Sequence, residues 1–99
     1  MSTNRNITRE ILKEIGIGSE KEAVRQYSLW IALSKKSKYE AECELYQKKY
    51  GMKYTEFLKR QKKKKGPEDF DLEDDLLDWR YAVEALKKWS NRVKSLQNG

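Results

Sequence analysis

The side chains that most often carry out chemistry in proteins are scarce in this 99-residue chain. It has no histidine and one cysteine, Cys43. Nucleophilic triads need an imidazole base, tetrahedral zinc sites draw on Cys and His, and an internal disulfide needs two thiols. A glycine-rich phosphate loop is also missing. We therefore expect no catalytic residue, no metal and no cofactor, and we look for the function among binding proteins.

Acidic side chains gather near residue 70. Four of them recur at helical spacing on one face, namely Asp71, Asp74, Asp75 and Asp78. They either complement the positive end of a helix dipole or form a docking face for a basic partner, with Phe70 and Trp79 as anchors. A calcium loop of the EF-hand type is excluded, because Asp74 replaces the required glycine and Arg80 replaces the bidentate glutamate.

Basic side chains gather just before the acidic ones, at Lys59, Arg60, Lys62, Lys63, Lys64 and Lys65. Cations are favoured at a helix C-terminus, so a solvated helix end explains them. The alternative is nucleic-acid binding, since lysines neutralise phosphates and release counterions. No sequence-reading motif accompanies them, so such binding would be nonspecific.

Glycines and capping residues organise the chain as a single helical domain, 1–99. Ser19 and Glu22 form a capping box, and no Gly or Pro follows before Gly51, which predicts one long helix over 19–51. The other predicted segments are a short N-terminal helix and linker (1–18), a short basic helix (52–65), a Gly-Pro and acidic turn (66–71) and a long C-terminal helix (72–97). Thr8 is the expected N-cap of the first helix and Asp71 that of the last.

Apolar stripes run along both long helices. In the first, Val24, Tyr27 and Ile31 make one run, and a second consists of Tyr39, Cys43, Tyr46 and Tyr50. We interpret the tyrosines as a helix seam rather than a base-stacking surface. Between the two runs, 34–38 is wholly polar, so a kink or turn there is the alternative to a continuous helix. The last helix carries its stripe at Leu72, Leu76, Trp79, Ala82, Val83, Leu86, Trp89, Val93 and Leu96.

Charge and aromatic content together predict the fold class. Residues 1–65 carry 17 basic and 8 acidic side chains (+9), and residues 66–99 carry 5 and 8 (−3), which recovers the net charge of +6. Two long helices of opposite charge favour an all-α, antiparallel helical hairpin with short accessory helices. Three tryptophans and six tyrosines are more aromatic area than two helices bury, so we expect oligomerisation or a partner to complete the fold.

The expected location is the cytoplasm. The longest uncharged stretch in the apolar part, 26–34, is about half of the ~20 residues that a bilayer span needs. The first eight residues contain no apolar core of a secretory signal. We therefore expect no membrane association.

Two compact motifs resemble small prokaryotic antitoxins of toxin–antitoxin pairs. They are Tyr50-Gly51-Met52 followed by Phe57, and the acidic run that ends at Trp79. The resemblance covers about residues 39–96 and implies neutralisation of a cognate basic toxin, often a nuclease, by direct binding. The chain departs from the pattern at Lys53, where a Ser or Thr would cap the short helix. The alternative function is a nonspecific nucleic-acid-binding helical dimer that uses Lys59–Lys65.

Overall fold

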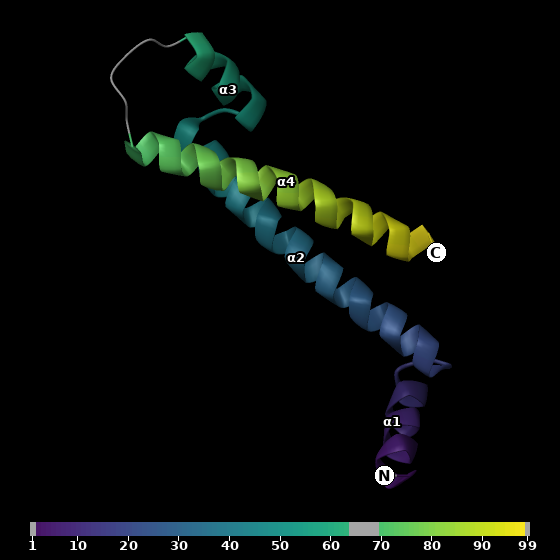
Figure 1. Ribbon diagram of the computed structural model, residues 1–99. Helices are drawn as coiled ribbons and strands as arrows, with labels where there is room; N and C mark the ends of the chain where they lie inside the picture. Colours follow the sequence, from purple (N-terminus) through teal and green to yellow (C-terminus); the bar gives the residue numbers. More distant parts are fainter. Residues whose placement is uncertain (1, 64–69, 99) are drawn as a thin grey trace.

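The protein is an all-α helical hairpin in the computed structural model, which describes residues 2–63 and 70–98 (Figure 1). Within these residues there are four helices and no strand: α1 (Ser2–Glu14), α2 (Glu20–Tyr50), α3 (Tyr54–Lys63) and α4 (Phe70–Asn98). The two long helices, α2 and α4, run antiparallel and pack against each other, and α3 contacts the first part of α4. The predicted fold class is confirmed.

Local capping chemistry sets the ends of α2. The Ser19 hydroxyl accepts a hydrogen bond from the Glu22 backbone N–H at 3.1 Å. At the other end Gly51 adopts φ 68°, the left-handed conformation, and its N–H donates to the Gln47 carbonyl at 2.7 Å. The helix continues through 34–38 without interruption, so the alternative of a kink or turn there is wrong.

The two other capping predictions are wrong because both helices begin earlier. α1 starts at Ser2, so Thr8 lies inside it, and the longer helix places Ile7 one turn before Ile11. α4 starts at Phe70, so Asp71 lies in its first turn rather than at its N-cap, where its carboxylate still complements the dipole. The last two residues of the predicted turn, 66–71, therefore belong to α4, and its first four lie outside the described residues.

α3 begins at Tyr54 although its N-cap has no acceptor side chain. The Lys53 carbonyl accepts the first helical hydrogen bond, from the Phe57 N–H at 3.0 Å. An ammonium group cannot accept a hydrogen bond, so α3 lacks the side-chain cap that Ser or Thr would supply. Its stability must come from packing, and Phe57 is 4% exposed against the hairpin.

The seam of α2 follows only one of the two predicted stripes. Val24, Tyr27 and Ile31 are 67%, 64% and 38% exposed and do not form it. Buried or half-buried side chains of α2 repeat at steps of three and four, at Leu29, Ala32, Lys36, Tyr39, Cys43, Tyr46 and Tyr50. A single partner helix covers one face, and the step of seven from Tyr39 back to Ala32 continues that face through the polar segment.

An aromatic cluster forms the core at the closed end of the hairpin. Trp79 is fully buried, and its ring lies 5.4–5.8 Å from those of Tyr46, Tyr50, Tyr54 and Phe57. The cluster therefore joins α2, α3 and α4. Aromatic pairs of this kind are worth about 0.5–1.5 kcal/mol each beyond the area they bury.

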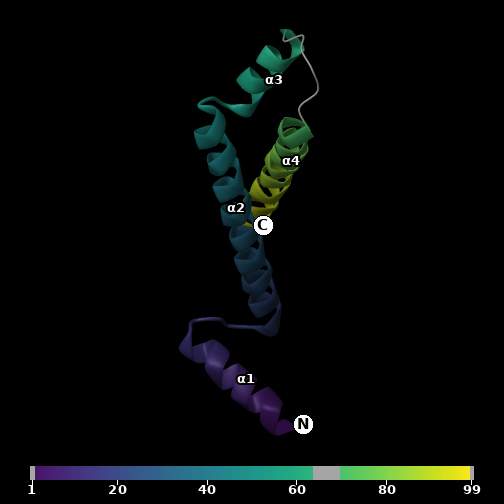
Figure 2. The ribbon, with the colours of Figure 1, turned by 90° about the vertical axis from the view of Figure 1, so that its left-hand side faces the viewer.

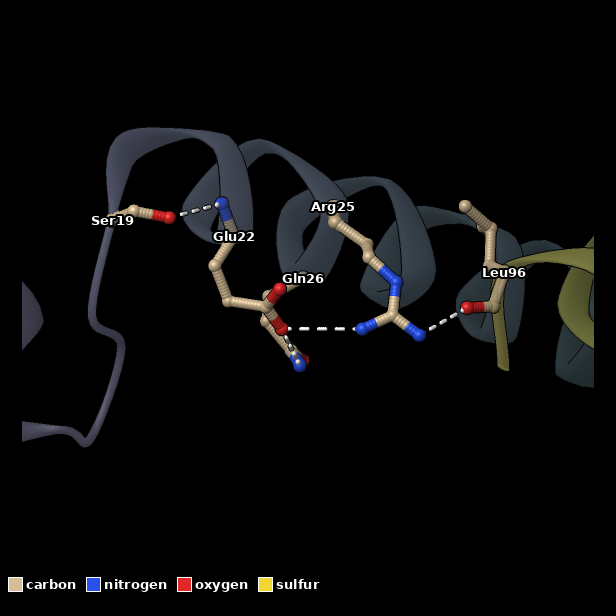
Figure 3. A network of polar contacts seen from close by, with 5 residues as sticks. All are labelled: Ser19, Glu22, Arg25, Gln26 and Leu96. Atoms are coloured by element: carbon tan, nitrogen blue, oxygen red, sulfur yellow. Dashed lines mark hydrogen bonds and ion pairs between the residues drawn. The ribbon is translucent and has the colours of Figure 1, made fainter. Parts of the chain in front are cut away.

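A polar clamp closes the other end of the hairpin (Figure 3). One guanidinium nitrogen of Arg25 donates to the Glu22 carboxylate at 3.2 Å, and the other donates to the Leu96 carbonyl at 2.6 Å. The second contact satisfies a carbonyl in the last turn of α4, where a cation also complements the dipole. The Glu22 carboxylate also accepts a hydrogen bond from the Gln26 side-chain amide at 3.3 Å. It therefore holds both Arg25 and Gln26.

The molecule is elongated. Its extents are 67 × 26 × 18 Å and its radius of gyration is 20.6 Å, whereas a compact chain of this length would have about 13 Å. Figure 2 shows α1 extending away from the hairpin and from both long helices. An exposed ion pair between Arg9 and Glu20, at 3.7 Å, joins α1 to the start of α2.

Candidate protein-binding surface

The acidic side chains of α4 divide into a free group and a bound one. Asp71, Asp74 and Asp78 are exposed. The Asp75 side chain is only 20% exposed, and its carboxylate accepts hydrogen bonds from the Lys49 ammonium and the Tyr50 hydroxyl. Three of the four predicted acids therefore lie on the surface, and the fourth joins α4 to the end of α2. We call the contacts of Asp75 with Lys49 and Tyr50 the Asp75 tie.

The contacts within the Asp75 tie shift the pKa of each of its three groups. Hydrogen bonds from Lys49 and then from Tyr50 lower the pKa of the Asp75 carboxyl. The same carboxylate raises the pKa of the Lys49 ammonium, chiefly through its hydrogen bond. Burial, followed by the hydrogen bond to Asp75, raises the pKa of the Tyr50 hydroxyl. At neutral pH the carboxylate is thus ionised and both partners keep their protons.

Of the two predicted anchors, Trp79 does not lie on the surface. Its side chain is 0% exposed at the centre of the aromatic cluster, and its indole Nε1 has no hydrogen-bond partner within the described part of the chain. Trp79 therefore supports the acidic turns from beneath instead of anchoring a partner. The side chain of Phe70, the other predicted anchor, lies outside what the structure describes.

A groove between α2 and α4 lies beside the exposed acids. It has a volume of about 640 Å³ and is lined by Leu45, Tyr46 and Lys49 from α2 and by Asp78 and Tyr81 from α4, among others. Leu45 and Tyr81 are 68% and 62% exposed there. This face combines exposed apolar side chains with carboxylates, as protein-binding surfaces do.

A second groove of about 420 Å³ opens farther along the same hairpin. Ile31 and Ala32 line it from α2, and Trp89, Arg92 and Leu96 line it from α4. Ile31 lies fourteen residues before Leu45, and Arg92 lies eleven after Tyr81. Both steps return close to the same side of a helix, so the two grooves share one face of the hairpin.

The described nucleic-acid candidates lie on α3. Lys59, Arg60, Lys62 and Lys63 are exposed, while Phe57 on the other side of α3 is buried. Lys64 and Lys65 lie outside the described residues. α3 therefore presents four cations to solvent in its last turns.

The described residues offer little for catalysis or metal binding. They contain no group of three Cys, His, Asp or Glu side chains placed to hold a metal ion. Cys43 is 6% exposed in the hairpin core, where burial, followed by the nearby Glu42 carboxylate, raises the pKa of its thiol. The thiol is thus a small buried apolar group and not an activated nucleophile.

Sequence reasoning missed the surface residues that complete this face. Leu45, Leu77 and Tyr81 are more than 60% exposed, yet each lies in a run that reads as helix interior. The contact of Lys49 and Tyr50 with Asp75 could have been predicted from the helical hairpin. An antiparallel hairpin brings the last turn of α2 beside the first turns of α4.

Comparison with known protein families, with curated proteins and with solved structures gives no match. The described helices include none that is long and apolar enough to cross a membrane. The function is therefore argued from the surface itself.

Proposed function

We propose that this chain is a non-catalytic protein-binding module, an antitoxin that neutralises a basic toxin by direct helix-mediated binding. The observation that carries the proposal is the amount of surface that the elongated chain, with α1 extending away from the hairpin, leaves open to solvent. The chain exposes 8224 Å², whereas a compact monomer of 11.8 kDa would expose about 5,900 Å². The excess of about 2,300 Å² is larger than the ~800 Å² that each partner contributes to a standard protein interface.

Charge indicates which kind of partner fits the acidic end of this surface. Asp71, Asp74 and Asp78 present three carboxylates on α4 that form no ion pair within 2–63 and 70–98, beside the apolar side chains of Leu77 and Tyr81. A toxin that cuts RNA carries cations that hold phosphates, and these carboxylates can occupy them in place of the substrate. The resemblance to antitoxins agrees with this choice of partner, and the cytoplasm is the location that goes with it.

The first test is the reading frame that neighbours the gene for this chain. We expect it to encode a small basic protein that arrests growth when expressed alone, and we expect co-expression of this chain to restore growth. A neighbour that is acidic or harmless would contradict the antitoxin assignment.

The second test locates the binding face by charge reversal. The triple variant Asp71→Lys, Asp74→Lys, Asp78→Lys leaves the Asp75 tie in place, so the hairpin should stay helical by circular dichroism. We expect its affinity for the basic protein to fall about 100-fold or more. The matched control, Glu14→Lys, Glu44→Lys, Glu56→Lys, makes the same change in net charge at exposed sites elsewhere and should bind normally. Unchanged affinity of the first triple variant would contradict the role of this face.

The exposed cations of α3 favour one alternative, nonspecific nucleic-acid binding by a helical dimer. Lys59, Arg60, Lys62 and Lys63 lie together on the outer side of a short helix. A mobility-shift titration at two salt concentrations separates the proposals. Tight binding that weakens steeply with salt supports the alternative, and absence of binding supports the protein partner.

A further inference from the structure

The outer face of α4 is self-complementary when two copies run antiparallel. Its first half, 71–84, exposes five acidic side chains and one basic one, a net charge of −4, because Asp75 is turned to α2, and its second half, 85–98, exposes four basic and no acidic side chains, a net charge of +4. An interface with two-fold symmetry uses the same patch on both copies, so the patch must complement itself. A helix with opposite charges in its two halves meets that condition when it pairs head to tail with its own copy.

One register aligns these charges residue by residue. Asp74, Tyr81 and Lys88 are each separated by seven residues, so they lie on the same side of α4. All three are exposed, and Tyr81 retains 62% of its accessible surface although its ring meets that of Tyr39 edge-on at 5.9 Å. If Tyr81 faces Tyr81 across the two-fold axis, Asp74 of each copy faces Lys88 of the other, because both lie two turns from Tyr81.

The neighbouring side chains fit the same register. Asp71 and Arg92 lie ten and eleven residues from Tyr81 on opposite sides, so the pairing brings these exposed charges together twice. Leu77, one turn before Tyr81 and 65% exposed, brings apolar surface next to the axis. Arg80 and Glu84 bond each other within one helix at 3.1 Å and need no partner across the interface.

The open surface of the whole chain, α1 included, is larger than such a pairing requires. The 8224 Å² that the chain exposes exceeds the surface of a compact monomer by more than the ~800 Å² per copy that a standard interface buries. Both grooves, of about 640 and 420 Å³, open beside the outer face of α4 and can receive side chains of the second copy. Two helical hairpins that pair along one face make a four-helix bundle.

From this geometry we infer that a second copy of the chain binds on the outer face of α4, antiparallel and centred on Tyr81, with reciprocal Asp74–Lys88 contacts. The inference concerns the free protein and does not depend on the toxin. It has a consequence for the proposed function, because the second copy covers Asp71 and Asp74. Self-association and binding of a basic partner then exclude each other, and the partner must displace the second copy.

The test is a charge swap that needs no other protein. We expect the wild-type chain to reach twice its 11.8 kDa by light scattering and sedimentation. Asp74→Lys and Lys88→Asp each turn two attractive contacts into two repulsive ones, and each variant should weaken self-association at least about tenfold. An equimolar mixture of the two variants restores both contacts and should form a heterodimer. The double variant restores both contacts between identical copies and should form a homodimer.

Controls keep the result specific. Glu56→Lys and Lys59→Asp make the same charge changes on exposed positions of α3 and should leave the dimer intact. A monomeric wild type, a dimeric Asp74→Lys variant, or a mixture that fails to associate would each overturn the inference. Binding to the toxin gives an independent readout, because Lys88→Asp breaks the dimer but keeps every carboxylate of the acidic face. We expect this variant to bind the toxin at least as tightly as the wild type.

Discussion

At the scale of single residues, Asp75 shows how position decides the use of a carboxylate. It belongs to the same acidic run as Asp71, Asp74 and Asp78, yet it alone lies opposite the last turn of α2 and receives two donors there. Its neighbours point to solvent and stay available for a partner. The sequence predicts the run but not this division, because the division depends on the register between two helices.

The lowered pKa of Asp75 gives its contact with Lys49 and Tyr50 a defined pH range. A carboxyl whose pKa is lower in the folded chain contributes stability above its ordinary pKa of 3.8 and loses that contribution as the pH falls through the lower folded value. We expect the melting temperature to fall as the pH drops below about 4. Asp75→Asn should melt a few degrees lower at pH 7 and show a smaller further loss in acid.

Thermal unfolding followed by circular dichroism from neutral to acid pH measures this effect. Asp78→Asn is the matched control, because it removes an exposed carboxylate one turn after Asp75 and outside the first turn of α4. It should follow the wild-type curve. Equal acid sensitivity in the Asp75→Asn variant and the wild type would show that the tie does not stabilise the hairpin.

At the scale of elements, helix ends are predicted best where a cap is local. Ser19 and Gly51 specify the ends of α2 through contacts within four residues, and both predictions hold. The seam of α2 is predicted less well, because Val24, Tyr27 and Ile31 have helical spacing just as Tyr39 and Cys43 do. Only the position of α4 decides which stripe is buried, and no local pattern contains that information.

Gly51 provides the test at this scale. Its φ of 68° lies in the left-handed region, where a Cβ is unfavourable although the surrounding space is open. Gly51→Ala should lower the free energy of unfolding by about 1 kcal/mol, which corresponds to about 4–8 °C in melting temperature. Gly18→Ala is the control, because that site is equally open and has no positive φ. Equal stability of the two variants in urea would exclude strain at Gly51.

At the scale of the whole molecule, composition predicted that the hairpin would leave apolar side chains exposed. The chain has too many aromatic side chains for a two-helix contact, and the hairpin leaves large apolar side chains exposed along α1, α2 and α4. The place of Leu45 and Tyr81 beside one groove could not be predicted, since the groove follows from the pairing of α2 with α4. The same limit applies to Trp79, whose place in the core depends on α3 folding over it.

The elongated shape yields the last prediction. Ile7 and Ile11 of α1, and Ile15 just after its end, recur at steps of four and are each 49–57% exposed, and Figure 2 shows α1 extending away from the hairpin. If this shape belongs to the single chain, small-angle X-ray scattering of the Asp74→Lys variant at low concentration should give a radius of gyration near 20.6 Å. A value near the ~13 Å of a compact chain would show that α1 folds back and covers its isoleucines. Ile11→Glu separates the two cases, because it should leave the radius unchanged in the extended chain and increase it in the folded-back one.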